Sequence, residues 1–279
     1  MLKAKQSRTQ KVGEVLVSWS PLGLILVAYL AAKLINQRLA DKVEPGSTNL
    51  LGLTLHIAEP AVADSWLFGR LPTVWLQDAW YSPTSPHWYD VIVALVYVSH
   101  FVNIPVVTTV LWFRCRARFR DWICCVLLLS FIGIATYVLY PMSPPWLASQ
   151  LGLTEQVHRI SGIGFDYLGL GAVEGLLGSS QAAANPVAAM PSLHAASAAL
   201  VALFFWSGAA WWLRVVLSLY PAVMGICLVY SGEHYVVDVV AGWIAAALAV
   251  VGWRLLRRSR SAMFVPDPIT AAGRSSARR

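Results

Sequence analysis

The sequence predicts an all-α integral membrane protein, a bundle of six transmembrane helices with an amphipathic interfacial segment between helices 1 and 2. Hydrophobic residues make up 57% of the 279 positions and charged residues only 13%. The chain therefore has too few polar side chains to cover a water-soluble globule of this size. Several apolar runs reach the roughly 20 residues that a bilayer-spanning helix requires, and they lack the alternation of membrane barrel strands.

Six apolar runs are each bounded by charged residues, proline or glycine, and we expect all six to span the membrane. They cover residues 14–35, 89–113, 122–140, 190–207, 212–231 and 235–256. We assign them to a single transmembrane domain over residues 1–260, with a motif-bearing core at 88–256. Residues 261–279 are predicted to form a disordered basic tail. Between the first two runs, an aromatic segment interrupted by Pro60 and Pro72 is expected to form short helices at the membrane surface.

The formal net charge of +7 does not indicate nucleic-acid binding, because the cations cluster beside the ends of the apolar runs. Three basic segments, at residues 3–11, 114–120 and 254–279, fall on one side of a six-span topology. The positive-inside rule makes that side cytoplasmic, so both termini are predicted to be cytoplasmic. An Ala- and Arg-rich composition points to a bacterial plasma membrane. The same topology places the loops at 36–88 and 141–189 outside.

Three polar segments from separate parts of the chain are predicted to meet at this outer face. They are "YPMSPPW" (140–146), "MPSLH" (190–194) and "SGEHYVVD" (231–238). Each contains proline or glycine next to an apolar run. Such a convergence at one end of a helical bundle is where a binding or catalytic site is expected.

Two histidines and one aspartate in these segments fit phosphoryl transfer. His234 and Asp238 are four residues apart, so on a helix they lie one turn, about 6 Å, from each other. The carboxylate can then orient the imidazole, which can attack phosphorus and form a phospho-histidine. His194 can protonate the leaving oxygen, and the Ser192 hydroxyl at a helix start can hold phosphate oxygens. His100, alone in the second span, is expected to be structural.

The motifs "PSLHAA" and "GEHYVVDVVAG" resemble the second and third signature motifs of the type 2 phosphatidic acid phosphatase superfamily. "YPMSPPW" makes the chain look like the branch of inositol phosphorylceramide synthases, the aureobasidin-resistance proteins. The resemblance implies that His234 is the nucleophile, Asp238 its orienting carboxylate, His194 the general acid and Ser192 a phosphate contact. It also implies a six-helix core, no cofactor or obligatory metal, and a lipid-phosphate substrate reached from the bilayer.

The chain departs from the family pattern in its cations. Leu228 stands where the phosphatases of this superfamily carry an arginine, and their first motif, with its Lys and Arg, is missing. We expect Arg159 to replace the lost phosphate clamp, with Arg70 as a weaker candidate. Because a phosphodiester carries one negative charge, fewer cations suffice, which favours headgroup transfer. A carboxylate such as Glu233 is unusual in a site that binds a dianion. We expect Glu233 to contact a polyol hydroxyl or to raise the pKa of the His234 imidazole.

The expected function is therefore transfer of a phospho-headgroup, with inositol phosphate as the expected group, from a phospholipid to a lipid or glycan hydroxyl at the outer face. An alternative is hydrolysis of a lipid or polyprenyl phosphate. Weaker alternatives are a metal-dependent intramembrane hydrolase, in which these histidines and carboxylates bind zinc, and a transporter. The expected partners are a phospholipid or polyprenyl-phosphate substrate and membrane lipid. The remaining candidate phosphate contacts are Tyr235, Pro144 and Trp146.

Overall fold

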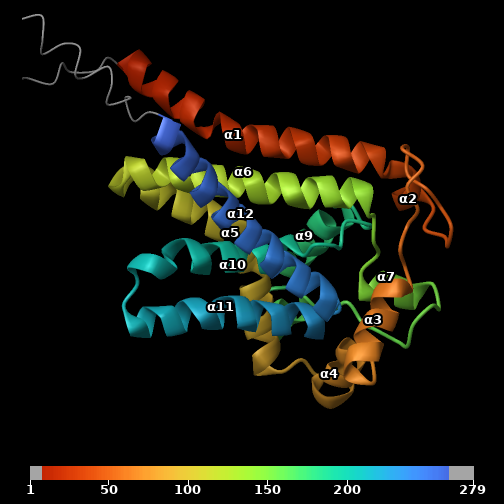
Figure 1. Cartoon of the computed structure of the whole chain (residues 1–279). Helices are drawn as coiled ribbons and strands as arrows, with labels where there is room; N and C mark the ends of the chain where they lie inside the picture. Colours follow the sequence, from red (N-terminus) through yellow and green to blue (C-terminus); the bar gives the residue numbers. More distant parts are fainter. Residues whose placement is uncertain (1–7, 264–279) are drawn as a thin grey trace, which may run out of the picture.

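The computed structural model describes residues 8–263, and these form a bundle of long helices with short helices and loops gathered at one end (Figure 1). Within residues 8–263, five helices are long and apolar enough to cross a membrane. They are α1 (Arg8–Ile35), α5 (Trp88–Arg114), α6 (Arg116–Leu139), α11 (Trp211–Tyr230) and α12 (Val236–Met263). Each coincides with one of the predicted spans. The predicted all-α membrane bundle is thus confirmed.

The remaining predicted span, 190–207, is shorter than expected. Its helix α10 (Leu193–Phe205) has 13 residues, followed by one 3-10 turn, η1 (Trp206–Gly208). At about 1.5 Å per residue, α10 covers about 20 Å of a hydrocarbon core of about 30 Å. It begins late because Ser192 is its N-cap, accepting a hydrogen bond from the Ala195 N–H. The prediction of six full-length spans is therefore wrong for one of them, because α10 is too short to cross the hydrocarbon core.

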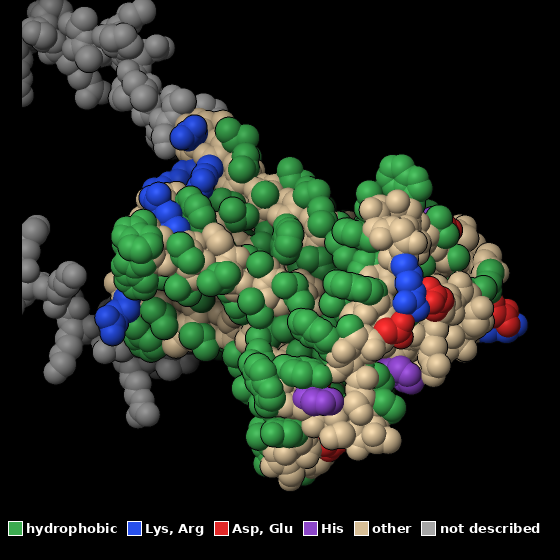
Figure 2. All heavy atoms as spheres, turned by 90° about the horizontal axis from the view of Figure 1, so that it is seen from below, with side chains coloured by type: hydrophobic (Ala, Val, Ile, Leu, Met, Phe, Trp, Pro, Cys, Tyr) green, Lys and Arg blue, Asp and Glu red, His purple; other side chains and the backbone are tan. Residues whose placement is uncertain are grey.

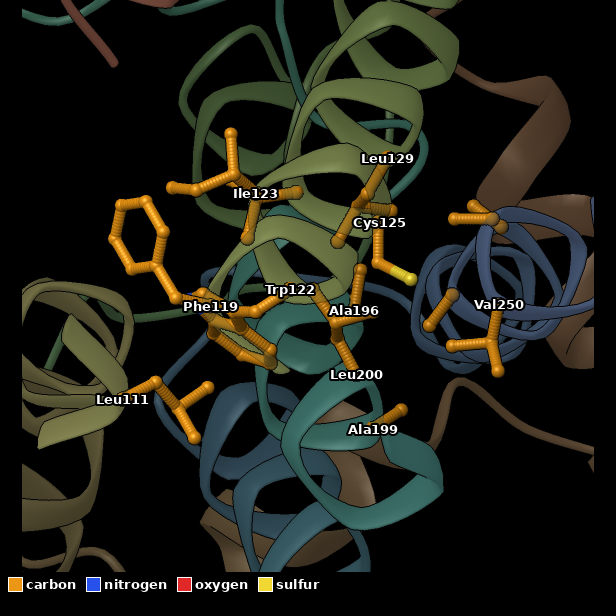
Figure 3. Packing of buried hydrophobic residues seen from close by; sticks show 14 of the residues in the cluster. Leu111, Phe119, Trp122, Ile123, Cys125, Leu129, Ala196, Ala199, Leu200 and Val250 are labelled. Atoms are coloured by element: carbon orange, nitrogen blue, oxygen red, sulfur yellow. The ribbon is translucent and has the colours of Figure 1, made fainter. Parts of the chain in front are cut away.

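The largest hydrophobic cluster lies where α6, α10 and α12 pack together. Figure 3 shows Ala196, Ala199 and Leu200 of α10 between α6 and α12. Trp122 of α6 is fully buried, and its indole N–H donates a hydrogen bond to Thr108 Oγ1 at 2.9 Å. Small residues let the helix backbones approach closely, which is how helices associate inside a membrane. The cluster holds α10 and α12, which carry the motif residues, in a fixed relative position.

Most basic residues of the long helices gather at the end of the bundle opposite the short helices, whereas Lys33 lies in the last turn of α1, at the other end. Arg116, at the start of α6, forms an ion pair with Glu14 of α1, and Arg257 of α12 pairs with Asp121 of α6. Figure 2 shows this cluster of Lys and Arg side chains at the left, with hydrophobic side chains over the middle of the molecule. The starts of α1 and α6 and the end of α12 thus meet at one end, as the topology prediction requires.

The segment between the first two long helices forms short helices, as predicted. These are α2 (Gln37–Asp41), α3 (Glu59–Phe68) and α4 (Pro72–Trp80). Pro60 and Pro72 stand at the beginnings of α3 and α4, where proline is tolerated because the first N–H groups have no helical partner. The outer faces of α3 and α4 expose Trp66, Trp75 and Trp80, which is typical of a segment lying in a membrane interface.

A residue on the inner face of α3 caps the N-terminus of α12, the helix that carries Asp238. Asp64 is fully buried, and its carboxylate accepts hydrogen bonds from the backbone N–H groups of Val236, at 2.7 Å, and Val237, at 3.1 Å. Burial raises the pKa of the Asp64 carboxyl, while these two N–H groups act in the opposite direction. The N-terminus of α12 therefore obtains its cap from a residue about 170 positions away.

Replacing Asp64 by Ala is expected to lower the free energy of unfolding by about 1–3 kcal/mol, because two buried N–H groups lose their acceptor. Thermal unfolding in detergent micelles measures this change. The matched control is Asp78→Ala on α4, whose exposed carboxylate pairs with Arg70 and should contribute less than about 1 kcal/mol. Equal losses in the two variants would contradict the capping role.

Backbone hydrogen bonds fold the loop from residue 140 to 192 back on itself and join it to the segment that precedes α3. The Met142 N–H donates to the Val187 carbonyl at 2.9 Å, and the His56 N–H donates to the Pro141 carbonyl at 2.9 Å. Three further short helices lie in this loop: α7 (Pro145–Gln150), α8 (Ile163–Tyr167) and α9 (Gly171–Ala182). At the other end of the chain, α12 runs to Met263, beyond the predicted start of the basic tail. The rest of that tail lies outside the described residues.

Candidate active site

The turn between α11 and α12 presents His234 to a cavity. The His234 Nδ1 atom lies 3.3 Å from Asp238 Oδ2, which also accepts the Tyr235 backbone N–H at 3.0 Å. Asp238 is fully buried behind the histidine, one helical turn further along α12. With Nδ1–H donated to this carboxylate, the Nε2 lone pair of His234 is left for attack on a substrate.

His194, in the first turn of α10, faces the same cavity. Its ring centroid lies 5.7 Å from that of His234. Two features bring the helices together: the Ser192 N–H donates to the Asp238 carbonyl at 3.1 Å, and Gly242 of α12 lies directly against the Ser192 carbonyl, so that a Cβ there would overlap it. The two imidazoles from different helices are therefore adjacent, as predicted from the sequence.

The other face of the His194 ring is covered by side chains of α5. The ring centroid lies 4.7 Å from that of Tyr97 in a stacked arrangement and 4.1 Å from that of His100. The Ser197 hydroxyl donates to the His194 carbonyl at 3.0 Å and lies 2.8 Å from His100 Nδ1. Within the described chain, His194 Nε2 is buried and has no hydrogen-bond partner.

Arg159 reaches the cavity from the loop between α7 and α8, held by Glu233. Its Nε donates to Glu233 Oε1 at 2.9 Å and its Nη2 to Oε2 at 3.0 Å. The guanidinium also lies over the Trp146 ring, 4.6 Å from the ring centroid. A two-point ion pair and an aromatic surface together fix the plane of the guanidinium.

Gly232 allows this loop to approach His234. It has a φ of +73°, and a Cβ at this position would lie 2.6 Å from the His158 carbonyl oxygen. The Ile160 N–H donates to the Ser231 carbonyl at 3.1 Å and fastens the loop to the turn. Only glycine combines this left-handed conformation with so close a contact. Gly232 thus brings the loop that carries Arg159 against the turn that carries His234.

The cavity has a volume of about 720 Å³, and its wall combines the polar groups described above with apolar side chains of α1, α5 and α9. Among the described residues that line it, Arg159 and Glu233 are the two that carry a formal charge, histidines aside. Leu26 and Tyr29 of α1 and Phe101 of α5 are among its apolar and aromatic lining. A polar end with two imidazoles and an apolar side suit an amphiphilic ligand.

The predicted site residues divide into two groups in the structure. The cavity lining includes His194, His234, Arg159, Pro144 and Trp146. Three others lie behind the wall and are fully buried: Asp238 next to His234, Ser192 as the N-cap of α10, and Tyr235 in a hydrophobic cluster. Ser192 and Tyr235 are the two that were predicted to contact phosphate. Their assignment as phosphate contacts stays a prediction.

Arg70, the weaker clamp candidate, is not brought to the cavity. Its guanidinium pairs instead with Asp78 at 2.8 Å and Glu155 at 2.9 Å. As for the zinc alternative, no group of three or more His, Cys, Asp or Glu side chains that could hold a metal ion occurs within residues 8–263.

Sequence reasoning missed several residues of the cavity. His100 was expected to be structural, yet it lines the cavity beside His194; its position as an ionisable residue within a span was a usable signal. Gln181 of α9 donates to Glu233 Oε1 at 3.1 Å and to the Tyr97 hydroxyl at 3.1 Å. Nothing in the local sequence of Gln181 marks it, because its contacts depend on how the loop between α6 and α10 folds back.

The sequence is similar to those of known proteins. A family model described as the PAP2 superfamily matches residues 63–252. The chain is 30% identical, over 179 residues, to a phosphoinositol dihydroceramide synthase of Bacteroides thetaiotaomicron, an alignment covering 60% of this chain and 56% of the relative. It is 31% identical over 137 residues to the inositol phosphorylceramide synthase catalytic subunit aur1 of Schizosaccharomyces pombe, covering 46% of this chain and 31% of the relative.

The chain thus spans about half or less of the length of these relatives. Among solved structures, the crystal structure of Aquifex aeolicus LpxE has a TM-score of 0.48 at 17% identity, covering 65% of this chain and 92% of that one. The family match takes in more than half of the chain, including the segments that supply His194, His234 and Asp238. The chain therefore belongs to the PAP2 superfamily.

Proposed function

We propose that this integral membrane protein transfers a phospho-headgroup, with phosphoinositol as the first candidate, from a phospholipid to a lipid or glycan hydroxyl through a phospho-histidine. The observation that carries the proposal is the pair of imidazoles, His194 and His234, 5.7 Å apart at one cavity with Asp238 behind the second. The names of the two relatives, both synthases that form phosphoinositol-linked ceramides, support the headgroup and a sphingolipid-type acceptor.

In the first half-reaction, His234 Nε2 attacks the phosphorus of the donor. The bond from phosphorus to the diacylglycerol oxygen breaks, and protonated His194 gives its proton to that oxygen. Asp238 stabilises the positive charge that His234 gains, through the Nδ1 contact of 3.3 Å. The products are diacylglycerol and a headgroup phosphate bound to His234.

In the second half-reaction, neutral His194 takes the proton of the acceptor hydroxyl. The acceptor oxygen attacks phosphorus, and the bond to His234 Nε2 breaks, which restores both histidines to their starting protonation states. Arg159, held over Trp146, is proposed to bind the non-bridging phosphate oxygens in both steps. Water in place of the acceptor would give hydrolysis by the same route.

The proposed setting is the outer face of a bacterial plasma membrane, with both termini in the cytoplasm. Supporting this orientation, the ion pairs that connect Arg116 to α1 and Arg257 to α6 lie at the end of the bundle opposite the cavity. The apolar side of the cavity, which includes Leu26 of α1, is proposed to receive the lipid chains of the substrate.

Replacing His234 by Ala is expected to reduce headgroup transfer by at least about 10⁴-fold, because the covalent route is lost. The assay supplies purified protein in lipid vesicles with labelled phosphatidylinositol and ceramide, and follows both the lipid product and acid-labile label on the protein. His158→Ala is the matched control, since the His158 ring packs against Tyr81 and does not line the cavity. Turnover retained by the His234 variant would refute the proposal.

A side-by-side assay separates transfer from hydrolysis. The same vesicles are offered phosphatidic acid, a monoester, or phosphatidylinositol, a diester, with and without ceramide. Transfer predicts a ceramide-linked product from the diester and slow release of free phosphate from the monoester. Rapid phosphate release from the monoester alone would show instead that the chain is a lipid phosphatase.

A further inference from the structure

The ion pair between Arg159 and Glu233 neutralises the cation that the cavity offers to a phosphate. Glu233 is 6% exposed, and both of its carboxylate oxygens accept hydrogen bonds from the guanidinium, at 2.9 and 3.0 Å. Two charges held together in this way present to a ligand the directed N–H groups of arginine with little net charge.

Glu233 is held in place by more than the arginine. Its Oε1 also accepts hydrogen bonds from the Ser161 hydroxyl at 2.6 Å and from the Gln181 amide at 3.1 Å. With Arg159, these donors come from two segments, the α7–α8 loop and α9, so three side chains hold the carboxylate in place. A phosphate entering the cavity cannot simply displace it, because four donated hydrogen bonds would have to be broken.

The rest of the cavity lining supplies no compensating charge. Apart from histidines, Arg159 and Glu233 are the charged side chains among the described residues that line it, and their charges cancel. Asp238 adds a further buried carboxylate behind His234. The energetic cost of moving an ion out of water rises steeply with its charge. A phosphate dianion would therefore be bound poorly here compared with a monoanion of similar size.

We propose that Glu233 is the specificity-determining residue that makes the site accept phosphodiester monoanions and reject phosphomonoester dianions. The inference rests on the proposed function, and it adds the reason why the chain acts as a transferase and not as a monoester phosphatase. Changing Glu233 to Gln removes one negative charge and leaves Arg159 uncompensated, so the variant binds dianions better than the natural protein does.

The test measures equilibrium binding and not turnover. Dissociation constants of short-chain phosphatidic acid and short-chain phosphatidylinositol are determined at pH 8 in a His234→Ala background, where no chemistry occurs. Adding Glu233→Gln is expected to shift the ratio of the two constants at least about tenfold toward phosphatidic acid, as expected for one unit charge a few ångströms away. A ratio unchanged within threefold, or equal weakening of both ligands, would overturn the proposal.

Two control variants separate charge from position. Ser161→Ala removes one hydrogen bond to Glu233 but no charge, so the ratio should remain within threefold. Glu155→Gln makes the same chemical change in an exposed ion pair with Arg70 that lies outside the cavity, and should also leave the ratio unchanged. A tenfold shift in either control would show that the ratio does not report the charge of Glu233.

A second measurement needs no variant at Glu233 and so does not depend on its folding. A phosphomonoester loses its second proton near pH 6, whereas a diester stays a monoanion. In the His234→Ala protein, binding of phosphatidic acid relative to phosphatidylinositol should improve as pH falls from 8 to 5. The comparison is decided at pH 8, because protonation of His100 or His194 at lower pH would attract a doubly charged ligand more strongly than a singly charged one. If phosphatidic acid binds more tightly than phosphatidylinositol at pH 8, the proposal is overturned. A failure to detect lipid transfer would not affect this binding ratio, so the two hypotheses can fail separately.

Discussion

Replacing Gly242 by Ala is expected to reduce turnover by at least about 100-fold. Gly242 packs against the carbonyl of Ser192, and a Cβ there would overlap this oxygen and lie 3.2 Å from the Ala196 nitrogen. Both contacts are backbone, so α10 must move away from α12 and take His194 away from His234. A displacement of about 1 Å between reacting groups is sufficient for a loss of this size, and overpacking costs about 1–3 kcal/mol of stability as well.

The matched control is Gly252→Ala, in the same helix. No atom lies within 4 Å of a Cβ built at Gly252, so this variant should keep its turnover and gain up to about 1 kcal/mol of stability from the better helix propensity of alanine. Thermal unfolding and turnover are measured for both variants. Similar turnover in the two proteins would show that the approach of α10 to α12 does not position the histidines.

Replacing Asp238 by Asn is expected to lower kcat by about 10³–10⁴-fold while KM changes little. The neutral amide can still accept the Tyr235 N–H, so the start of α12 remains folded, but it no longer stabilises the positive charge that His234 gains on attack. A loss confined to kcat marks an interaction that acts in the transition state. Rates with saturating donor lipid give the comparison.

Asp121→Asn is the control for this change. Asp121 belongs to α6 and lies beside the far end of α12, where it accepts hydrogen bonds from Trp253 and Arg257. Its loss should destabilise the bundle modestly and leave kcat within threefold. An Asp238→Asn protein that keeps more than a tenth of the natural kcat would contradict the orienting role.

The sequence predicted the long helices well because their signal is local. A run of about 20 apolar residues must be helical in a bilayer, whatever the rest of the chain does. The same reasoning failed for residues 190–207, where an apolar composition hid a helix of 13 residues. There the helix start depends on the Ser192 cap and on the approach of α12, which a hydropathy pattern does not contain.

The central site residues were also predictable, for a chemical reason. The spacing of His234 and Asp238 fixes their contact through helix geometry alone, and ionisable groups in apolar runs draw attention. The relationship between Arg159 and Glu233, in contrast, joins residues 74 positions apart through a loop. Sequence reasoning named both residues but placed them separately, and it assigned the acidic one no arginine partner.

The cap that Asp64 provides has a practical consequence for anyone who shortens this protein. A gene fragment encoding residues 88–256 would retain His194, His234 and Asp238, yet it would lack the carboxylate that closes the N-terminus of α12. It would also lack Gln77, whose amide donates to the Tyr230 and His158 carbonyls at 2.8 Å. Expression work aimed at a minimal enzyme must therefore begin upstream of α3, even though every signature residue lies downstream of it.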